Sequence, residues 1–180
     1  MLLIEVPGGE YYDEINETFI KIKPQTIRME HSLISLSKWE AKWKKPFLTS
    51  KKTIEETVDY YRCMCVTPNV NPNIFYALPD SCYKKITDYI QEERTATTFS
   101  RNVKTTGRKE IFTSELIYYY MVANQIPTEY EKWHLSRLLT LLKICSIKND
   151  PKPKKMSKAA ISKQNKSINA ARRAKMHSKG

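Results

Sequence analysis

The periodicity of the chain changes at residues 32–46, which have the sequence SLISLSKWEAKWKKP. Apolar side chains recur there at helical spacing, at Leu33, Leu36, Trp39 and Trp43. Residues at such intervals share one face of an α-helix. Ser32 is a favourable N-cap and Pro46 cannot continue a helix. The stretch therefore predicts an amphipathic helix between these two residues.

Further helices are expected on the C-terminal side of this one. Thr53 and Glu56 form a capping-box pattern, which predicts a helix that runs through Met64 towards Pro68. A third helix is predicted at roughly 81–93, with Asp80 or Ser81 as its N-cap. A fourth is predicted from Thr113 to a point before Pro127. A second capping-box pattern, Thr128 with Glu131, predicts a helix to about Ile147. That helix is so apolar that we expect it centrally in the core.

The first thirty residues have the pattern of strands. Leu2–Val6 is apolar and precedes the turn signal Pro7-Gly8-Gly9, and residues 18–23 alternate apolar with basic or polar side chains. A small β-hairpin with an acidic loop is therefore predicted before Pro24. With five or so helices after it, the expected fold class is α+β and predominantly helical.

The charge of the chain is concentrated at one end. Residues 148–180 contain eleven Lys and Arg against the single acid Asp150, a net +10, whereas residues 1–147 carry 20 basic and 18 acidic residues, a net +2. Pro151 and Pro153 interrupt any helix at the boundary. We therefore expect a helical globular domain at 1–147 and a basic tail at 148–180, either disordered or a lone helix.

Residue patterns of an enzyme or a cofactor site are scarce. The chain lacks GxGxxG, GxxxxGK[ST] and CxxC patterns, so we expect no catalytic residue, cofactor or metal. His134 fits a hydrogen-bonded histidine of the core better than a general base. The N-terminus has no signal-peptide pattern, and no stretch is long enough to span a membrane. These features predict a non-enzymatic protein of a reducing cytoplasm.

Two surfaces are candidates for binding a partner. The first is the Trp39–Trp43 stripe beside several lysines, which also fits a core stripe with lysine stems over the rings. The second is the basic tail, which could bind phosphates, dock on an acidic or amphipathic protein, or only keep the chain soluble. The tail residues predicted to bind are Lys154, Lys155, Lys158, Arg172 and Arg173.

Two runs carry a resemblance to a known family. Residues 31–40, HSLISLSKWE, continue to KPFL at 45–48, and residues 115–141 run from ELIYYY to WHLSRLLTL. Together they resemble the tail assembly chaperones of long-tailed, siphophage-type bacteriophages, and the resemblance covers most of the chain. It implies a non-enzymatic protein of the host cell cytoplasm that binds the tape-measure protein and assists assembly of the tail tube protein. Absence from the mature virion is also implied. A homo-oligomer is a further candidate assembly of this chain.

An alternative function follows from the tail. A nucleic-acid-binding protein, or a structural virion protein of the connector or tail, would use the cationic tail to contact phosphates. Strong salt dependence of nucleic-acid binding is the expected signature of this alternative.

Overall fold

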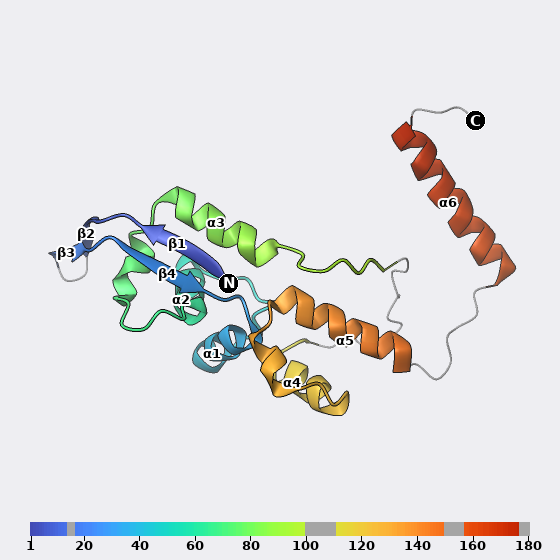
Figure 1. The fold of residues 1–180 in the computed structure, drawn as a ribbon, viewed down its shortest axis with the longest axis horizontal. Coiled ribbons are helices and arrows are strands. Elements are labelled where there is room, and N and C mark those ends of the chain that lie inside the picture. The colour runs from blue at the N-terminus through green and yellow to red at the C-terminus, as the bar shows by residue number, and fades with distance from the viewer. Residues whose placement is uncertain (14–16, 100–110, 150–156, 177–180) are drawn as a thin grey trace. The chain divides into compact units, whose positions relative to one another are not determined.

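A computed structural model describes residues 1–13, 17–99, 111–149 and 157–176 of the chain (Figure 1). Its strands are β1 (Leu2–Val6), β2 (Gly9–Asp13), β3 (Thr18–Ile22) and β4 (Gln25–Met29). Its α-helices are α1 (Leu33–Trp43), α2 (Ile54–Met64), α3 (Asp80–Gln91), α4 (Ser114–Ala123), α5 (Leu135–Asn149) and α6 (Lys158–Met176). Two short 3₁₀ helices, η1 (Pro72–Tyr76) and η2 (Thr128–Lys132), complete the described elements. The predicted class, α+β and predominantly helical, is confirmed.

The N-terminal strands pair differently from the prediction. β1 pairs antiparallel with β4, from Leu2 opposite Met29 to Val6 opposite Gln25, and β2 pairs with β3. Both ladders keep the same register, so they form one long hairpin that is interrupted where Pro7 faces Pro24. Proline has no N–H to donate to a ladder, which explains the interruption. The predicted pairing of the first strand with residues 18–23 was therefore wrong, and β4 was missed.

The β1–β4 ladder is buried on one face. Ile4 and Val6 from β1 and Ile27 and Met29 from β4 alternate inward and are at most 3 % exposed. The other edge of β4 is closed by the chain that follows α2, where the Val66 amide donates to the Arg28 carbonyl at 2.9 Å. This ladder is thus the wall against which the helices pack.

Gly8 lies against the ring of Pro24, next to the point where the hairpin is interrupted. A Cβ at this position would come within 2.9 Å of Pro24 Cδ, closer than real Cβ atoms approach a neighbour. Gly8→Ala should therefore lower the free energy of unfolding by about 1–3 kcal/mol, the usual cost of overpacking. Gly9→Ala is the matched control, because a Cβ there meets nothing within 4 Å. Urea unfolding of both variants measures the difference, and equal stabilities would contradict this explanation.

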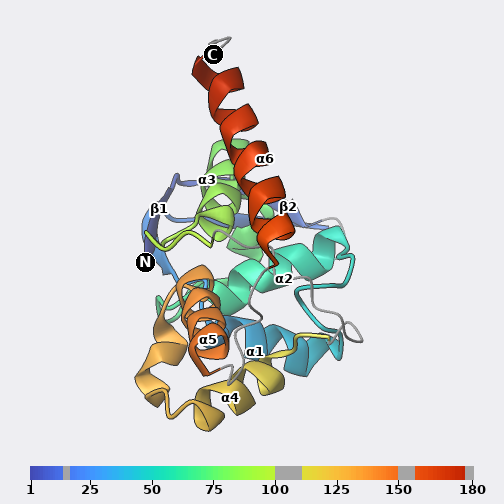
Figure 2. The same cartoon turned by 90° about the vertical axis from the view of Figure 1, so that its right-hand side faces the viewer.

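The helices of Met1–Cys145 enclose one core. α1 packs against α2 and α4, and α3 lies along β1, as both views show (Figures 1 and 2). Trp39, Leu36 and Met64 from α1 and α2 are fully buried, and Ile86, Ile117 and Leu138 bring α3, α4 and α5 to the same cluster. α4 and α5 thus complete a core that the hairpin and the first two helices begin.

Most predicted helix starts are confirmed. The Ser32 hydroxyl accepts from the Ser35 amide, and Thr53 and Glu56 form the complete capping box. α3 departs from the prediction, because it follows Pro79 without a side-chain cap. Pro79 suits this position, since the amide it lacks is one that a helix start leaves unpaired.

The single helix predicted from Thr128 to Ile147 is two elements. η2 has no side-chain cap, and the backbone of Trp133 is extended before α5 begins. The Leu135 amide donates to the His31 carbonyl at 2.9 Å, which anchors the start of α5 on the chain between β4 and α1. α5 buries Leu135, Leu138 and Leu142, whereas Ile147 near its end is 46 % exposed. The prediction that this helix lies centrally in the core was therefore wrong.

The C-terminal part forms a separate unit, Ser146–Gly180. Its described portion includes α6, and this agrees with the lone-helix form of the predicted tail. The predicted boundary at Pro151 and Pro153 lies outside the described residues.

Candidate functional site

The Trp39–Trp43 stripe belongs to the α1–α2 interface. Trp39 is 0 % exposed, and its indole N–H donates to the Glu56 carbonyl at 2.7 Å. Trp43 is half-buried, and its N–H donates to Asp59 Oδ2 at 2.8 Å. Lys42 donates to the other oxygen of Asp59 at 2.6 Å. The core alternative is therefore confirmed for Trp39. Because its side chain is fully buried, the prediction that Trp39 contacts a partner was wrong.

The predicted tail residues fall into three groups. Lys154 and Lys155 lie outside the described residues. Lys158 is exposed at the start of α6, and Arg172 lies within that helix. Arg173 is exposed, and its Nε donates to the Asn169 carbonyl at 3.4 Å. Where they are described, the tail cations therefore belong to one helix.

A buried carboxylate fixes the position of α4. Glu40 is 6 % exposed, and its two oxygens accept from the Phe47 amide at 2.6 Å and from the Ser114 amide at 2.7 Å. Ser114 is the first residue of α4, where helix amides lack partners within the helix. The carboxylate thus supplies a cap to α4 from another helix, while the Thr113 side chain accepts from the Leu116 amide.

α4 packs on the core by one side only. Ile117 and Met121 are buried, whereas Tyr119 and Val122 on the opposite side are 63 % and 77 % exposed. Phe112, which is also exposed, stacks on the half-buried Tyr120 with ring centroids 6.0 Å apart. The Tyr120 ring in turn meets Tyr119 edge-on at 5.5 Å. Phe112, Tyr119, Tyr120 and Val122 are called the α4 face below.

The α4 face is held in place by a contact with η2. The Tyr118 hydroxyl donates to Glu131 Oε2 at 2.9 Å. Burial and, second, this acceptor carboxylate raise the pKa of Tyr118 to about 12, so the hydroxyl stays protonated and keeps donating at neutral pH. Tyr130 of η2 stacks on Trp133 with ring centroids 3.9 Å apart, and the Arg137 guanidinium lies 4.0 Å from the centre of the Trp133 ring.

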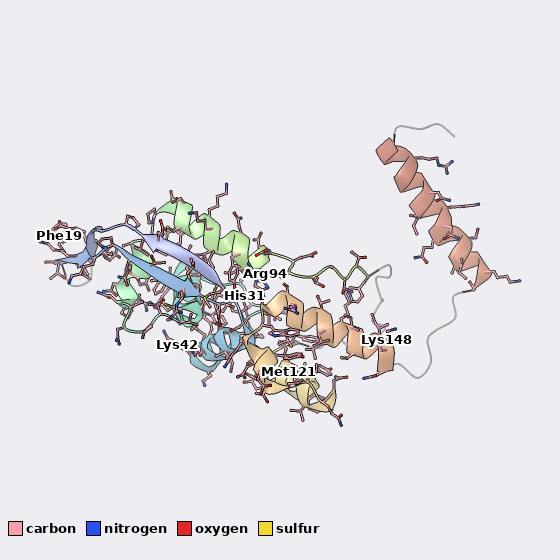
Figure 3. All side chains as sticks on the ribbon, in the orientation of Figure 1. Phe19, His31, Lys42, Arg94, Met121 and Lys148 are labelled. Atoms are coloured by element: carbon pink, nitrogen blue, oxygen red, sulfur yellow. The ribbon has the colours of Figure 1, made fainter. Side chains whose placement is uncertain are left out.

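Two histidines of the core, His31 before α1 and His134 before α5, lie side by side and contact α2 and α3. Figure 3 labels His31 close to the ends of α3 and α5, and its ring lies 5.1 Å from that of His134. His31 Nδ1 shares a hydrogen bond of 2.6 Å with the Tyr60 hydroxyl. His134 is bonded to the Tyr89 carbonyl at 2.9 Å, as the core alternative predicted. Burial lowers the pKa of both rings, and that of His31 falls to about 3.

His134 also lies beside a hydroxyl, a contact that the sequence did not reveal. Its Nδ1 is 2.8 Å from Ser136 Oγ. That hydroxyl donates to the Glu92 carbonyl at 3.1 Å and accepts from the Arg94 amide at 3.2 Å. Through these contacts Ser136 links the start of α5 to the segment that follows α3.

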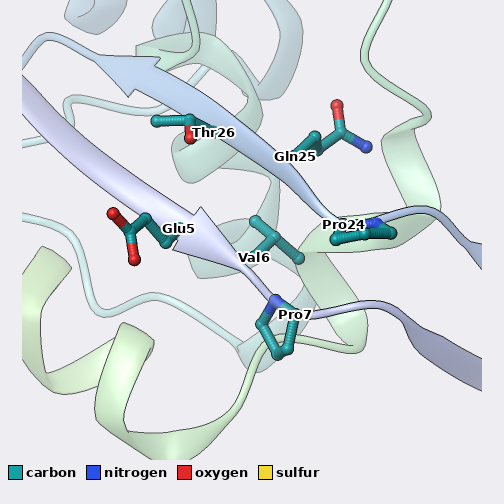
Figure 4. Close-up of a pocket in the computed structure, with 6 residues that line it drawn as sticks. All are labelled: Glu5, Val6, Pro7, Pro24, Gln25 and Thr26. Carbon is teal, nitrogen blue, oxygen red and sulfur yellow. The ribbon is translucent and has the colours of Figure 1, made fainter.

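The remaining described features do not form a catalytic or metal-binding site. A shallow depression lies between the two ladders of the hairpin, lined by Glu5, Val6, Pro7, Pro24, Gln25 and Thr26 (Figure 4). One carboxylate among prolines and amides has no partner for acid–base work there. Within the described ranges, no group of three or more His, Cys, Asp or Glu could hold a metal ion. None of the described helices is both long and apolar enough to cross a membrane.

The α4 face was not predicted from the sequence. The sequence predicts a strongly apolar helix from Thr113 to a point before Pro127, and such a helix is normally assigned to the core. No stripe of charged residues marks its exposed side, which holds Tyr119 and Val122. No family model, curated protein or solved structure matches the chain.

Proposed function

We propose that this protein is a phage tail assembly chaperone that binds the tape-measure protein and assists assembly of the tail tube. The observation that carries the proposal is the α4 face, an aromatic and apolar surface on a helix that is anchored by its other side. Exposed apolar groups that lie together on a soluble domain usually mark a site of protein binding. The resemblance of residues 31–48 and 115–141 to tail assembly chaperones supports the same function.

The mode of binding follows from the shape of the client. A long helical protein offers apolar side chains at intervals of three and four residues, and a flat helix face can bury them. Aromatic side chains such as Tyr119 give large contact areas at low entropic cost. The rigid anchoring of α4 by Glu40 and Tyr118 means that little order must be gained on binding.

Co-expression tests this function. The protein and the tape-measure protein of the same phage are produced together, with an affinity tag on one of them. The soluble yield of the client should rise, and the two proteins should co-purify. Tyr119→Ser with Val122→Ser should reduce the co-purified client at least about tenfold, since two apolar side chains lose their burial. Unchanged solubility together with no co-purification would refute the proposal.

A matched control isolates the α4 face from general surface effects. Ile54 at the start of α2 is 83 % exposed, and Ile54→Ser removes a comparable apolar side chain from another surface. This variant should co-purify with the client as the wild type does. An equal loss with Ile54→Ser would show that the α4 face is not the binding site.

The second candidate function is a nucleic-acid-binding or structural virion protein. It is favoured by α6, which carries six Lys and Arg and no acid. Binding to DNA or RNA should then weaken steeply with salt and disappear when residues 151–180 are deleted. Mass spectrometry of purified virions distinguishes a structural component, which is present, from a chaperone, which is absent.

A further inference from the structure

α6 is positively charged along its whole length. Its six cations are Lys158, Lys163, Lys166, Arg172, Arg173 and Lys175, and residues 158–176 contain no Asp or Glu. The lysines at 158, 163 and 166 are exposed. No acid in the first turn offsets the positive end of the helix dipole. A partner that neutralises this helix must therefore be anionic.

α6 also has an apolar stripe that charge alone does not explain. Ile161 and Ile168 are 45 % and 41 % exposed and stand seven positions apart. A separation of seven returns to within about 20° of the same side of a helix. Ile161 and Ile168 thus have the seven-residue spacing with which one helix packs on another, with the polar Gln164 at the three-residue step between them.

A nucleic acid would account for the cations of α6 but not for its two isoleucines. No aromatic side chain occurs in residues 158–176, so α6 has no aromatic ring on which a base could stack. Phosphate contacts would use the lysines but would leave Ile161 and Ile168 in water. A helical protein partner with acidic flanks would neutralise the cations and bury the isoleucines together.

We propose that α6 binds an acidic amphipathic α-helix of a partner protein. Ile161 and Ile168 pack against the apolar stripe of that helix, and the lysines of α6 pair with the carboxylates that flank it. The inference rests on the proposed function only for the biological identity of the partner, which would be a segment of the chaperone's client. Binding of the helix itself is a property of α6.

The experiment uses the full-length protein and a designed peptide. The probe is a fluorescein-labelled 21-residue peptide with Leu at heptad positions a and d, Glu at e and g, and Ala and Gln elsewhere. Binding is followed by fluorescence anisotropy in 150 mM salt. The periodic peptide should bind at least tenfold more tightly than a peptide of the same composition in scrambled order. Ile161→Ser with Ile168→Ser should weaken binding of the periodic peptide at least tenfold.

Three controls make the outcome interpretable. Ala159→Ser with Ala170→Ser changes two exposed positions away from the isoleucine stripe and should leave the affinity within twofold of wild type. Circular dichroism of each variant shows whether the helix content is retained. A 20-base-pair DNA duplex is titrated under the same conditions as a polyanion without an apolar stripe.

Several results would overturn the inference. Equal affinity for the periodic and scrambled peptides, or tighter binding of the duplex, would show that α6 is a general polyanion site. No binding of any probe would show that it is not a binding element. These outcomes are separable from the co-expression test, because loss of the client in the Tyr119 and Val122 variant does not involve α6.

Discussion

Replacing Glu40 by Gln should lower the free energy of unfolding by about 3 kcal/mol. The carboxylate is buried and accepts from the amides of Phe47 and Ser114, and both bonds are 2.7 Å or shorter. A glutamine has one acceptor oxygen, so one of the two amides would face an NH₂ group instead. A buried donor without an acceptor costs about 1–3 kcal/mol, and loss of a bond to a charged group adds to that cost.

Urea denaturation followed by tryptophan fluorescence measures this effect. Glu93→Gln is the matched control, because Glu93 is exposed at the end of α3 and such surface changes stay within about 0.5 kcal/mol. Since Ser114 begins α4, the Gln variant should also expose more of that helix to limited proteolysis. If the two variants unfold at the same urea concentration, Glu40 does not hold α4 in place.

Stability should fall by about 2–3 kcal/mol between pH 6.5 and pH 4.5 through His31 alone. Burial and, second, the neighbouring His134 lower the pKa of His31 from an ordinary 6.5 to about 3. Below pH 6.5 the unfolded chain therefore binds a proton that the folded chain does not. The contribution is fully present above pH 6.5 and is lost progressively down to about pH 3, at about 1.4 kcal/mol per pH unit.

Titration of Glu56 does not obscure this interval. The hydrogen bond from Lys45 and, second, that from the Thr53 amide lower the pKa of Glu56 from 4.5, so its contribution is lost only at more acidic pH. Unfolding free energies measured in urea at pH 7.0, 5.5 and 4.5 reveal the slope. His31→Asn keeps a polar group near the Tyr60 hydroxyl and should reduce this slope, with the remainder due to His134, whose pKa burial also lowers. A variant with the wild-type slope would mean that another group titrates.

The local features of the fold could be predicted because they depend on neighbouring residues. The Thr53 capping box and the Ser32 cap each involve groups three positions apart, and both formed as expected. The hairpin register could not be predicted in the same way. It depends on Pro7 meeting Pro24 and on which strand face the helices cover, and both are properties of the assembled molecule.

The split of the last predicted helix has a similar origin. Residues 128–147 have helical periodicity, but His31 and Tyr89 accept hydrogen bonds from Leu135 and His134 and so fix the chain between η2 and α5. Tertiary contacts of this kind override helix propensity. The α4 face was missed for the opposite reason, since an apolar helix gives no local sign of which side will remain uncovered.

The bridge from Glu40 to Ser114 has a consequence for the newly made chain. Synthesis proceeds at roughly 5–20 residues per second, so the 74 residues between these two positions take on the order of 4–15 s. During that interval one carboxylate oxygen of Glu40 has no amide to accept from, and the surface of α1 that α4 will cover is exposed to water. The nascent hairpin and first two helices are thus a half-built domain. A chaperone of the proposed kind would thus expose apolar surface of its own while it is being synthesised.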